Sequence, residues 1–391
     1  MSESPGADTP DSGTPTKKEV ATGASVTNNF TELLSSPNPL IDVRAPEEYA
    51  AGHFANSINL PILEDEERHQ VGLCYRENGQ EKAIALGHQL VNSLNAQTRI
   101  DSWKRAVQNQ GAQAIYCWRG GLRSSIAQQW LKESGCQIPR IQGGYKSLRQ
   151  FCLTTLDKAA QEEAKAKKAW LVLAGRTGSG KTEFLNTREE SIDLEGFAQH
   201  RGSAFGRTDE AQPSLPTFEH LLTRAYLQHE REILILEDES RTIGRLAIPE
   251  SWFHLMRQVP VLVLEVDQET RIDNIYSEYV AVPSTASSSL SNSLSNSLSN
   301  REGEPLKTRY LDATDRIRKR LGGERHNKVR KLIALAFENA DEQLHREWIE
   351  RLLTWYYDPM YDYQLEKKMA RVVCRGNVEE ISNHLNKLSR S

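Results

Sequence analysis

The segment around Cys117 has the residue types of an anion-binding loop that carries a reactive sulfur. The cysteine follows the apolar run 114–116, and Arg119, two glycines and Arg123 lie within the six residues after it. Glycines allow a tight turn in which backbone N–H groups face one centre, and the arginines add positive charge. Such surroundings favour a thiolate and lower the pKa of a cysteine from about 8.5 to about 3.5–7.5. We therefore predict Cys117 as the reactive atom, with Arg119 and Arg123 as catalytic partners, in preference to a buried cysteine that only packs.

A second anion-binding pattern, typical of loops that bind phosphate, lies in the middle of the chain. Residues 175–182 match G-x-x-x-x-G-K-[ST] and stand between an apolar run and a helical pattern, which is the context that this motif requires. Its glycines let backbone N–H groups face a polyphosphate, its lysine contacts the terminal phosphates, and its threonine hydroxyl can bind Mg²⁺. The predicted diphosphate-binding residues are Gly175, Gly178, Gly180, Lys181, Thr182 and Asp238.

Two acidic residues follow the apolar run 233–236 and complete this predicted site. In phosphate-loop enzymes an acid at such a strand end holds Mg²⁺, so we predict Mg²⁺ at Thr182 and Asp238, with Glu237 as the alternative acid. The segment 200–206 is either a second anion-contacting loop or an ordinary surface turn. The motif alone does not separate a kinase or NTPase from an enzyme that binds another diphosphate.

Composition excludes several classes of protein. The 391 residues have a formal net charge of −4, so only a local basic patch could bind nucleic acid. The five cysteines are odd in number and widely spaced, without a C-x-x-C pair, which argues against a disulfide framework and a structural zinc site. The N-terminus lacks the apolar segment of a signal peptide, and the apolar runs are too short to cross a bilayer. We expect a cytoplasmic protein with no membrane partner.

Short apolar runs that alternate with helical patterns predict an α/β fold with two parallel-sheet domains. Strands are predicted at 40–43, 114–117, 169–174, 233–236 and 259–266, and helices at 83–94 and 124–133. The predicted organisation is a disordered tail (1–28), a first parallel-sheet domain (29–156), a helical connector (157–168), a phosphate-loop α/β domain (169–283), a flexible insertion with repeated Ser-Asn-Ser-Leu (284–304) and a helical C-terminal region (305–391).

Several stretches of the first domain resemble the rhodanese family, in which a cysteine in an anion-binding loop carries a sulfane sulfur or a related chalcogen. These stretches are residues 42–49, 52–54, 58–61 and 143–146. The resemblance places Cys117 at the position of that cysteine. It implies a rhodanese-like parallel-sheet domain followed by a P-loop NTPase-like α/β domain. It also implies that Asp42 and Arg44 brace the loop and that His53 supports a turn.

The two domains together resemble the tRNA 2-selenouridine synthase family, through residues 117–124, 143–146, 175–182, 200–206, 237–241 and 243–244. The resemblance implies a tRNA partner whose wobble 2-thiouridine, in the anticodon loop, is first geranylated and then converted to 2-selenouridine. It implies geranyl diphosphate and selenophosphate as co-substrates, and a selenophosphate-supplying enzyme as a further partner. Residues 175–182 would bind the diphosphate, and Cys117 would carry selenium.

The residues also admit other interpretations. The chain could be a P-loop kinase or NTPase with a rhodanese-like sulfur-carrier domain, or a non-catalytic module that senses anions or oxidants through Cys117. The spacing from this cysteine to Arg123 fits cysteine phosphatases as well, although no histidine precedes it. We expect Cys74 and Cys136 to be buried and inert.

A basic segment near the C-terminus is the predicted RNA contact. Residues 316–331 hold eight arginines and lysines and a single acid, and aromatic residues follow them. Basic side chains could contact phosphates, and Trp355 or Tyr356 could stack on a loop base. The alternatives are a solvated basic helix face and an aromatic core.

Overall fold

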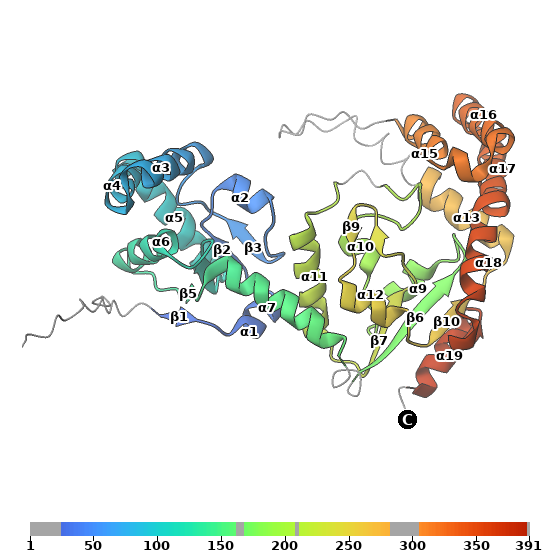
Figure 1. Ribbon diagram of the computed structural model, residues 1–391, viewed down its shortest axis with the longest axis horizontal. Helices are drawn as coiled ribbons and strands as arrows, with labels where there is room; N and C mark the ends of the chain where they lie inside the picture. The colour runs from blue at the N-terminus through green and yellow to red at the C-terminus, as the bar shows by residue number, and fades with distance from the viewer. Residues whose placement is uncertain (1–24, 162–167, 208–210, 282–304, 389–391) are drawn as a thin grey trace, which may run out of the picture.

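A computed structural model describes residues 25–161, 168–207, 211–281 and 305–388. Two parallel sheets, each flanked by helices, lie side by side along the long axis of the molecule, with a helical region at the outer edge of the second (Figure 1). This arrangement confirms the predicted α/β fold. The predicted insertion at 284–304, most of the tail at 1–28 and residues 162–167 of the predicted connector lie outside the described residues.

The first domain is built on a five-stranded sheet in the order β1-β5-β4-β2-β3, and all of its strand pairs are parallel. Its strands are β1 (Val26–Thr27), β2 (Leu40–Asp42), β3 (Ser57–Asn59), β4 (Ala114–Tyr116) and β5 (Arg140–Ile141). The apolar residues of β2 and β4 are completely buried, because helices cover both faces of the sheet. Strand β1 lies within the predicted tail, so the ordered domain begins earlier than expected.

Seven helices of this domain connect or flank the strands in the described residues. They are α1 (Phe30–Ser35), α2 (Pro46–Ala50), α3 (Asp65–Asn78), α4 (Gln80–Leu90), α5 (Ser93–Gln110), α6 (Leu122–Glu133) and α7 (Gly144–Ala159). The helix predicted at 83–94 ends at Leu90, because Asn92 caps α5 by accepting a hydrogen bond from the Asn95 N–H. Helix α6 begins two residues before the predicted position, so the cysteine loop is very short.

The second domain has a parallel sheet in the order β11-β10-β6-β7. Its strands are β6 (Ala169–Gly175), β7 (Ile233–Glu237), β10 (Val261–Leu264) and β11 (Val372–Gly376), beside a small hairpin of β8 (Thr242–Ile243) and β9 (Leu246–Ala247). Its helices are α9 (Lys181–Asn186), α10 (Leu194–Ala198), α11 (Leu215–Gln228), α12 (Glu250–Met256), α13 (Gln268–Tyr276), which continues as a π-helical turn (Ser277–Ala281), and α19 (Val378–Leu388).

Strand β11 departs from the prediction that the C-terminal region is helical. It is a short edge strand with alternating half-buried and exposed residues, and only its parallel pairing with β10 defines it. The remainder of this region consists of α15 (Leu306–Leu321), α16 (Gly323–Asn339), α17 (Glu342–Leu352), a π-helical turn (Leu353–Tyr357), α18 (Asp358–Glu366) and a short 3₁₀ turn (Met369–Arg371).

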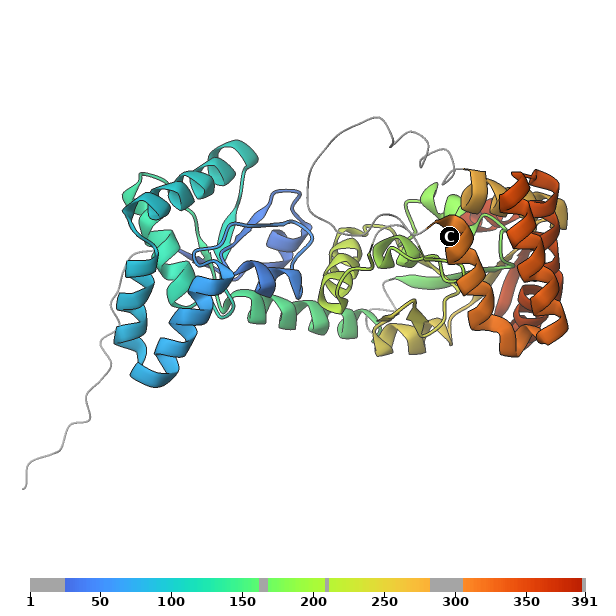
Figure 2. The ribbon, with the colours of Figure 1, turned by 90° about the horizontal axis from the view of Figure 1, so that it is seen from above.

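Helices α7 and α11 join the two domains. Leu156 and Ala159, near the end of α7, belong to the apolar core of the second domain, and Trp252 Nε1 donates a hydrogen bond to the Leu156 carbonyl at 2.9 Å. Figure 2 shows α7 running from the first domain to α12 of the second. The predicted boundary at 156 therefore falls inside a helix that both domains share. Among the described residues, no helix is both long and apolar enough to cross a membrane.

Candidate functional site

Cys117 directly follows β4, and its loop turns immediately into α6. The N–H of Tyr145 donates to the Cys117 carbonyl at 2.9 Å, and the N–H of Lys146 donates to the Trp118 carbonyl at 3.0 Å. The first turn of α7 therefore fixes the start of the cysteine loop through two backbone hydrogen bonds. Arg140 adds a hydrogen bond from Nη1 to the Gly120 carbonyl at 2.5 Å. These contacts fix the loop backbone around the sulfur.

Two glycines are required for this close approach. Gly120 and Gly144 both have positive φ angles, of 63° and 61°. A Cβ at Gly144 would lie 2.2 Å from the Cys117 carbonyl oxygen and 2.4 Å from the Gly120 nitrogen. Those neighbours are backbone atoms, which cannot rotate away. Only glycine fits where the loop meets α7.

The sulfur itself is nearly enclosed. Cys117 is 3% exposed and belongs to an apolar cluster of the first domain, and its Sγ lies 3.2 Å from the Ser124 Oγ. The loop residues Trp118 and Leu122 are 40% and 47% exposed. The predicted cysteine is thus in the predicted loop, and very little of its side chain is exposed to solvent.

The two predicted arginine partners differ in their surroundings. Arg123 forms a two-point ion pair with Glu48 of α2, with Nη1 to Oε2 at 2.5 Å and Nη2 to Oε1 at 3.1 Å. Burial is the largest single influence on the Arg123 guanidinium and lowers its pKa. The hydrogen bond and the charge of Glu48 together outweigh burial, so the pKa is raised above its ordinary value. Arg119 is exposed on the loop. Arg123 therefore braces α6 against α2, and Arg119 lies at the surface.

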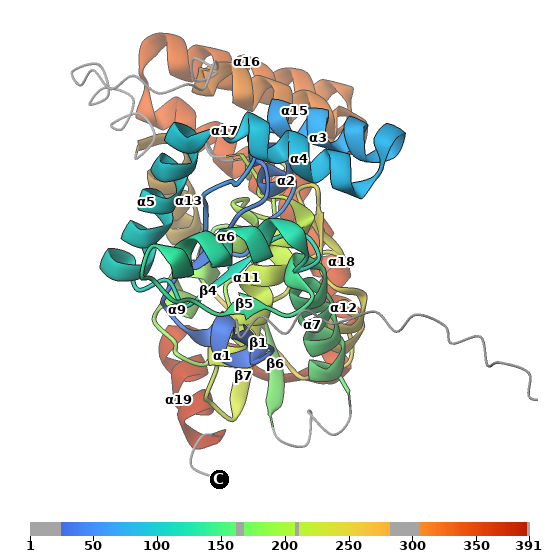
Figure 3. The same ribbon diagram turned by 90° about the vertical axis from the view of Figure 1, so that its left-hand side faces the viewer.

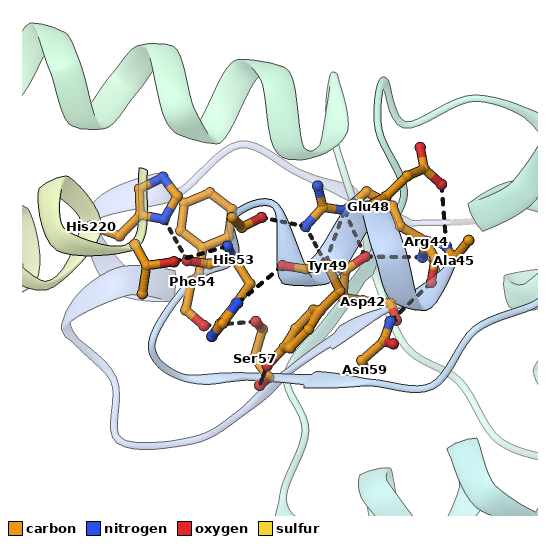
Figure 4. A network of polar contacts seen from close by, with 12 residues as sticks. Asp42, Arg44, Ala45, Glu48, Tyr49, His53, Phe54, Ser57, Asn59 and His220 are labelled. Carbon is orange, nitrogen blue, oxygen red and sulfur yellow. Dashed lines mark hydrogen bonds and ion pairs between the residues drawn. The ribbon is translucent and has the colours of Figure 1, made fainter. Parts of the chain in front are cut away.

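The bracing role implied for Asp42 and Arg44 agrees with their contacts. Both side chains are completely buried and form an ion pair at 2.6 Å, and Arg44 also donates to the Gly52 carbonyl at 2.9 Å. The Arg44 guanidinium stands over the Tyr145 ring at 3.9 Å. Figure 4 shows the polar contacts of Asp42 and Arg44, together with Glu48 and Tyr49 of α2. The ion pair thus links β2 to the residue of α7 that holds the cysteine loop.

The same network continues into the second domain through His220 of α11, a residue that the sequence did not single out. Its Nδ1 lies 2.6 Å from the His53 carbonyl oxygen, and its ring stacks on Phe54 at 4.0 Å (Figure 4). Burial lowers the pKa of His220 to about 3, so the ring is neutral. His53 packs its own ring on Tyr49 and forms a turn with it, as the resemblance implied.

The phosphate loop lies between β6 and α9, as the motif predicts. Gly178 and Gly180 have positive φ angles of 81° and 73°. Lys181 Nζ donates to the Gly175 carbonyl at 2.9 Å, and the buried Ser179 Oγ has no hydrogen-bond partner. A buried hydroxyl without a partner in a phosphate loop is suited to donate a hydrogen bond to a bound anion.

Two arginines, Arg271 of α13 and Arg176 of the loop itself, connect the phosphate loop to α18. Arg271 of α13 donates from Nε to the Thr177 carbonyl at 2.9 Å and forms an ion pair with Asp358 of α18 at 2.5 Å. Arg176 of the loop pairs with Asp362 at 2.7 Å. The C-terminal helical region is therefore part of the phosphate site, a role that its sequence did not indicate.

Glu237, and not Asp238, faces the predicted metal position. The Thr182 hydroxyl donates to Glu237 Oε1 at 3.2 Å and to Glu195 Oε2 at 3.4 Å. Asp238, which we predicted as the ligand, instead receives hydrogen bonds from Lys368 Nζ on both carboxylate oxygens. The two acids point to different sides because they are neighbours in an extended chain.

Three acidic side chains, Glu195, Glu237 and Glu239, gather beside Thr182. Burial and the charge of Glu195 raise the pKa values of Glu237 and Glu239. Within the described ranges, no group of three or more acidic, histidine or cysteine side chains forms a ready-made metal cage. Mg²⁺ commonly binds one or two carboxylates together with water and substrate phosphates. Thr182 and Glu237 fit that arrangement, and Glu195 completes the acidic wall.

Segment 200–206 lies against this acidic wall. The Gly202 N–H donates to Glu195 Oε1, and Arg201 forms an ion pair with Glu278 at 2.7 Å. Its Phe205 belongs to the core of the C-terminal helices. The segment is thus a structured loop next to the phosphate site and not an isolated surface turn.

The basic residues and the aromatic residues of the predicted RNA contact differ in their exposure to solvent. Seven of the eight basic side chains in 316–331 are exposed, on α15 and α16. Tyr356 is 9% exposed and belongs to the aromatic core, which makes a stacking role for it incompatible with this structure. Trp355 is half-buried beneath the guanidinium groups of Arg325 and Arg351.

The free cysteines outside the loop have no comparable surroundings. Cys136 is 6% exposed, and burial raises its pKa. Cys152 lies under the domain interface, where burial raises its pKa to about 12. Cys74 is half-buried on α3, less enclosed than we expected. Cys117 is therefore the only cysteine of the described chain within an arginine-rich glycine loop.

The two loops define a class: a rhodanese-like domain joined to a phosphate-loop domain. The family model of the rhodanese-like domain matches residues 27–150, and the model described as the tRNA 2-selenouridine synthase AAA domain matches residues 168–391. The chain belongs to the tRNA 2-selenouridine synthase family.

Full-length relatives agree with both domain matches. A tRNA 2-selenouridine synthase of Shewanella woodyi is 43% identical over 356 residues, which cover 89% of this chain and 94% of the relative. One of Marinobacter nauticus is 44% identical over 368 residues, with 91% and 96% covered. Among solved structures, the N-terminal domain of a putative ATP/GTP binding protein from Clostridium difficile aligns with 32% of this chain and 98% of its own, at 31% identity and a TM-score of 0.30.

Proposed function

We propose that this chain replaces the sulfur of wobble 2-thiouridine in tRNA by selenium, through a geranylated intermediate. The co-substrates are geranyl diphosphate and selenophosphate. The observation that carries the proposal is the presence of two different cradles in a chain that matches tRNA 2-selenouridine synthases over nine-tenths of its length. A thiol loop set among arginines suits an anionic selenium donor, and a phosphate loop set among carboxylates suits a diphosphate bound with Mg²⁺.

The phosphate loop is proposed for the first step. The 2-thio sulfur attacks the first carbon of the geranyl group, the C–O bond to diphosphate breaks, and the proton on N3 of the base is released. Lys181 and the loop N–H groups stabilise the negative charge that develops on the departing diphosphate. Thr182 and Glu237 would hold Mg²⁺, which supplies further charge stabilisation when bound.

The Cys117 loop is proposed for the second step. Selenium of selenophosphate attacks C2 of the base, the C–S bond breaks, and geranylthiol leaves with a proton. Water then cleaves the P–Se bond and releases phosphate. Because the selenium of selenophosphate is already at the selenide level, this sequence needs no oxidant. Loop N–H groups and Arg119 would hold the phosphate part of the donor, and the Cys117 thiol would supply the proton that geranylthiol takes as it leaves.

The partners follow from this chemistry. A tRNA anticodon loop presents the wobble base unpaired, so the base can enter a pocket without opening a duplex. The exposed basic residues of α15 and α16 are the proposed phosphate contacts. An enzyme that makes selenophosphate would supply the donor. All five cysteines are free thiols, which fits a reducing compartment such as the cytoplasm.

Two substitutions test the division of labour. Each variant is incubated with purified tRNA, geranyl diphosphate and selenophosphate. The tRNA is then digested to nucleosides, which are measured by mass spectrometry. Lys181→Ala should reduce geranylation by on the order of 10²-fold or more and still convert tRNA that was geranylated beforehand. Cys117→Ser should accumulate geranylated tRNA, while the control Cys74→Ser behaves as the wild type.

The opposite outcomes are equally clear. Full geranylation by Lys181→Ala would contradict the assignment of the phosphate loop, and full 2-selenouridine formation by Cys117→Ser would contradict that of the cysteine. Nucleotide hydrolysis in the absence of tRNA and of geranyl transfer would favour the kinase or NTPase alternative.

A further inference from the structure

An apolar cavity of about 560 Å³ lies in the first domain, between the α3–α4 hairpin and α6. It is larger than a second cavity of this domain, beside Leu60 and Trp103, whose volume is about 310 Å³. Figure 3 shows α3, α4 and α6 on the side of this domain that faces away from the phosphate-loop domain. Its volume is within the range of about 300–1,000 Å³ that is usual for small-molecule sites.

The cavity has a buried apolar floor and a partly exposed rim. Ile62, Leu63, Ala83 and Val91 line it and are each less than a tenth exposed, whereas Tyr75 is 57% exposed. Helix α3 buries none of its 14 residues completely, although Val71 and Tyr75 face inward to the cavity. The hairpin therefore stands away from the domain core and leaves apolar side chains uncovered.

This cavity shares a wall with the cysteine loop. Leu122 and Arg123, the first residues of α6, line it, and they directly follow the glycines beside Cys117. Ile62, Leu63 and Cys117 belong to one continuous apolar cluster. The first turn of α6, which follows the cysteine loop in the chain, thus forms part of the cavity wall. Two further cations, Arg68 and Arg76, line it as well and give a charged border to an apolar space.

The cavity beside the phosphate loop is much smaller. The cavity that touches the phosphate loop, at Thr177, has a volume of about 30 Å³.

We propose that the cavity between α3, α4 and α6 binds the apolar chain that the base carries during the exchange of sulfur for selenium. This inference rests on the proposed function, because that function brings an alkylated base to Cys117. The chain would lie among Ile62, Val71 and Ala83, with the base at the α6 end beside the cysteine loop. The departing thiol would stay in the cavity, while the arginines at the border contact anionic groups of the RNA or of the selenium donor. Binding the chain would thus add to the affinity for the geranylated base and not for 2-thiouridine itself.

Gly72 allows a test that leaves the fold intact. It lies within α3 and lines the cavity, and a Cβ placed on it meets no atom within 4 Å. Gly72→Leu would fill part of the cavity with a good helix former, and Gly72→Ala would fill less. The matched control is Gln70→Leu, two residues earlier on the same helix, where the side chain is exposed and does not line the cavity.

The experiment uses the full chain and anticodon stem-loop RNAs that carry S-geranyl or S-methyl 2-thiouridine. Binding is measured by fluorescence anisotropy, and conversion to 2-selenouridine is measured with saturating selenophosphate. We expect the wild type and Gln70→Leu to bind the geranyl RNA at least about 10-fold more tightly than the methyl RNA. Gly72→Leu should lose that preference, mainly through KM, and Gly72→Ala should lose part of it. Geranylation of 2-thiouridine RNA should stay within about twofold in every variant.

Three outcomes separate this inference from the proposed function. A preference for the geranyl RNA that persists in Gly72→Leu would overturn the inference. Wild-type conversion of geranyl and methyl RNAs with equal KM and equal affinity would also overturn it and leave the proposed function standing. If the wild type binds the geranyl RNA preferentially but never forms 2-selenouridine, the cavity assignment stands and the proposed function fails.

Discussion

The two glycine-rich loops follow buried parallel strands and lead into helices, but their surroundings carry opposite charge. Arg140 donates to the Gly120 carbonyl of the first loop, and Arg119 is exposed on that loop. Arg123 lies in the helix that follows it. Around Lys181, in contrast, Glu195, Glu237 and Glu239 gather on the far side of Thr182. The first loop is ready for an anion alone. The second is complete only when a cation accompanies the anion.

Under the proposed function, this difference would let one chain bind two phosphate-containing donors at separate sites. A small dianion suits a compact positive loop. A diphosphate bound with Mg²⁺ suits a loop that offers amides and a lysine on one side and carboxylates on the other. The surrounding charge, more than the loop motif, therefore separates the two sites.

The largest effect is expected from adding a methyl group where the first loop meets α7. Gly144→Ala should destabilise the first domain by roughly 3 kcal/mol, because the new Cβ meets backbone atoms and φ is positive. Gly121→Ala, in the same loop, should change stability by less than about 0.5 kcal/mol, since its Cβ meets nothing within 4 Å. Denaturant unfolding of both variants measures the difference. Equal midpoints would show that the loop is not held as described.

A carboxylate substitution should separate stability from catalysis in the second loop. Glu237→Gln should raise the melting temperature at neutral pH without Mg²⁺. Burial and the charge of Glu195 raise the pKa of Glu237 to about 8, so folding must protonate a carboxylate that is ionised in the unfolded chain, and the amide does not carry this cost. The same change should lower Mg²⁺ affinity and geranyl transfer by roughly 10–100-fold. Thermal melting with and without Mg²⁺ and initial rates of geranylation provide the measurement. Unchanged Mg²⁺ affinity would move the metal away from Glu237.

The smallest effect concerns the contact between the two regions. Burial lowers the pKa of His220 to about 3, whereas the unfolded ring titrates near 6.5. The unfolded state therefore gains the proton first, so the stabilisation from this residue is full above pH 6.5 and is lost as pH falls from 6.5 toward 3. By pH 5.5 the loss is about 1.4 kcal/mol.

His220→Gln keeps a side-chain amide that can donate to the His53 carbonyl and removes the titration. Its melting temperature should fall less between pH 7.5 and 5.5 than that of the wild type. Parallel curves for the two proteins would show that the pH dependence arises from other groups.

Local patterns in the sequence predicted the parts of the site that are continuous in the chain. The cysteine loop, the phosphate loop and the strands before them each occupy a few consecutive residues, and the structure places all of these at or near the predicted positions. The sequence could not decide whether Glu237 or Asp238 faces Thr182, because contacts with residues far away in the chain determine it. Lys368, 130 residues away, engages one acid, and Thr182 contacts the other.

Features that depend on distant segments could not be predicted in this way. Strand β11 exists because β10 offers it an edge, and its own residues carry no strong strand pattern. His220 lies on a helix of the second domain and gains its importance from the His53 carbonyl of the first. The burial of Cys117 likewise depends on helices packed around the loop. Pairings across large sequence separations leave no mark in a window of neighbouring residues.

Helix α7 has a consequence for any attempt to divide the molecule. Its N-terminal residues grip the cysteine loop, and Leu156 and Ala159 sit in the core of the other domain. A fragment that stops at 156 would expose the apolar end of α7 to water. A fragment that starts at 169 would have a cavity in its core, because the side chains of Leu156 and Ala159 would be missing. Neither half is a module that can be cut out and reused. A truncated protein meant to fold by itself would have to keep the helix whole and carry new polar residues on the surface thereby laid bare.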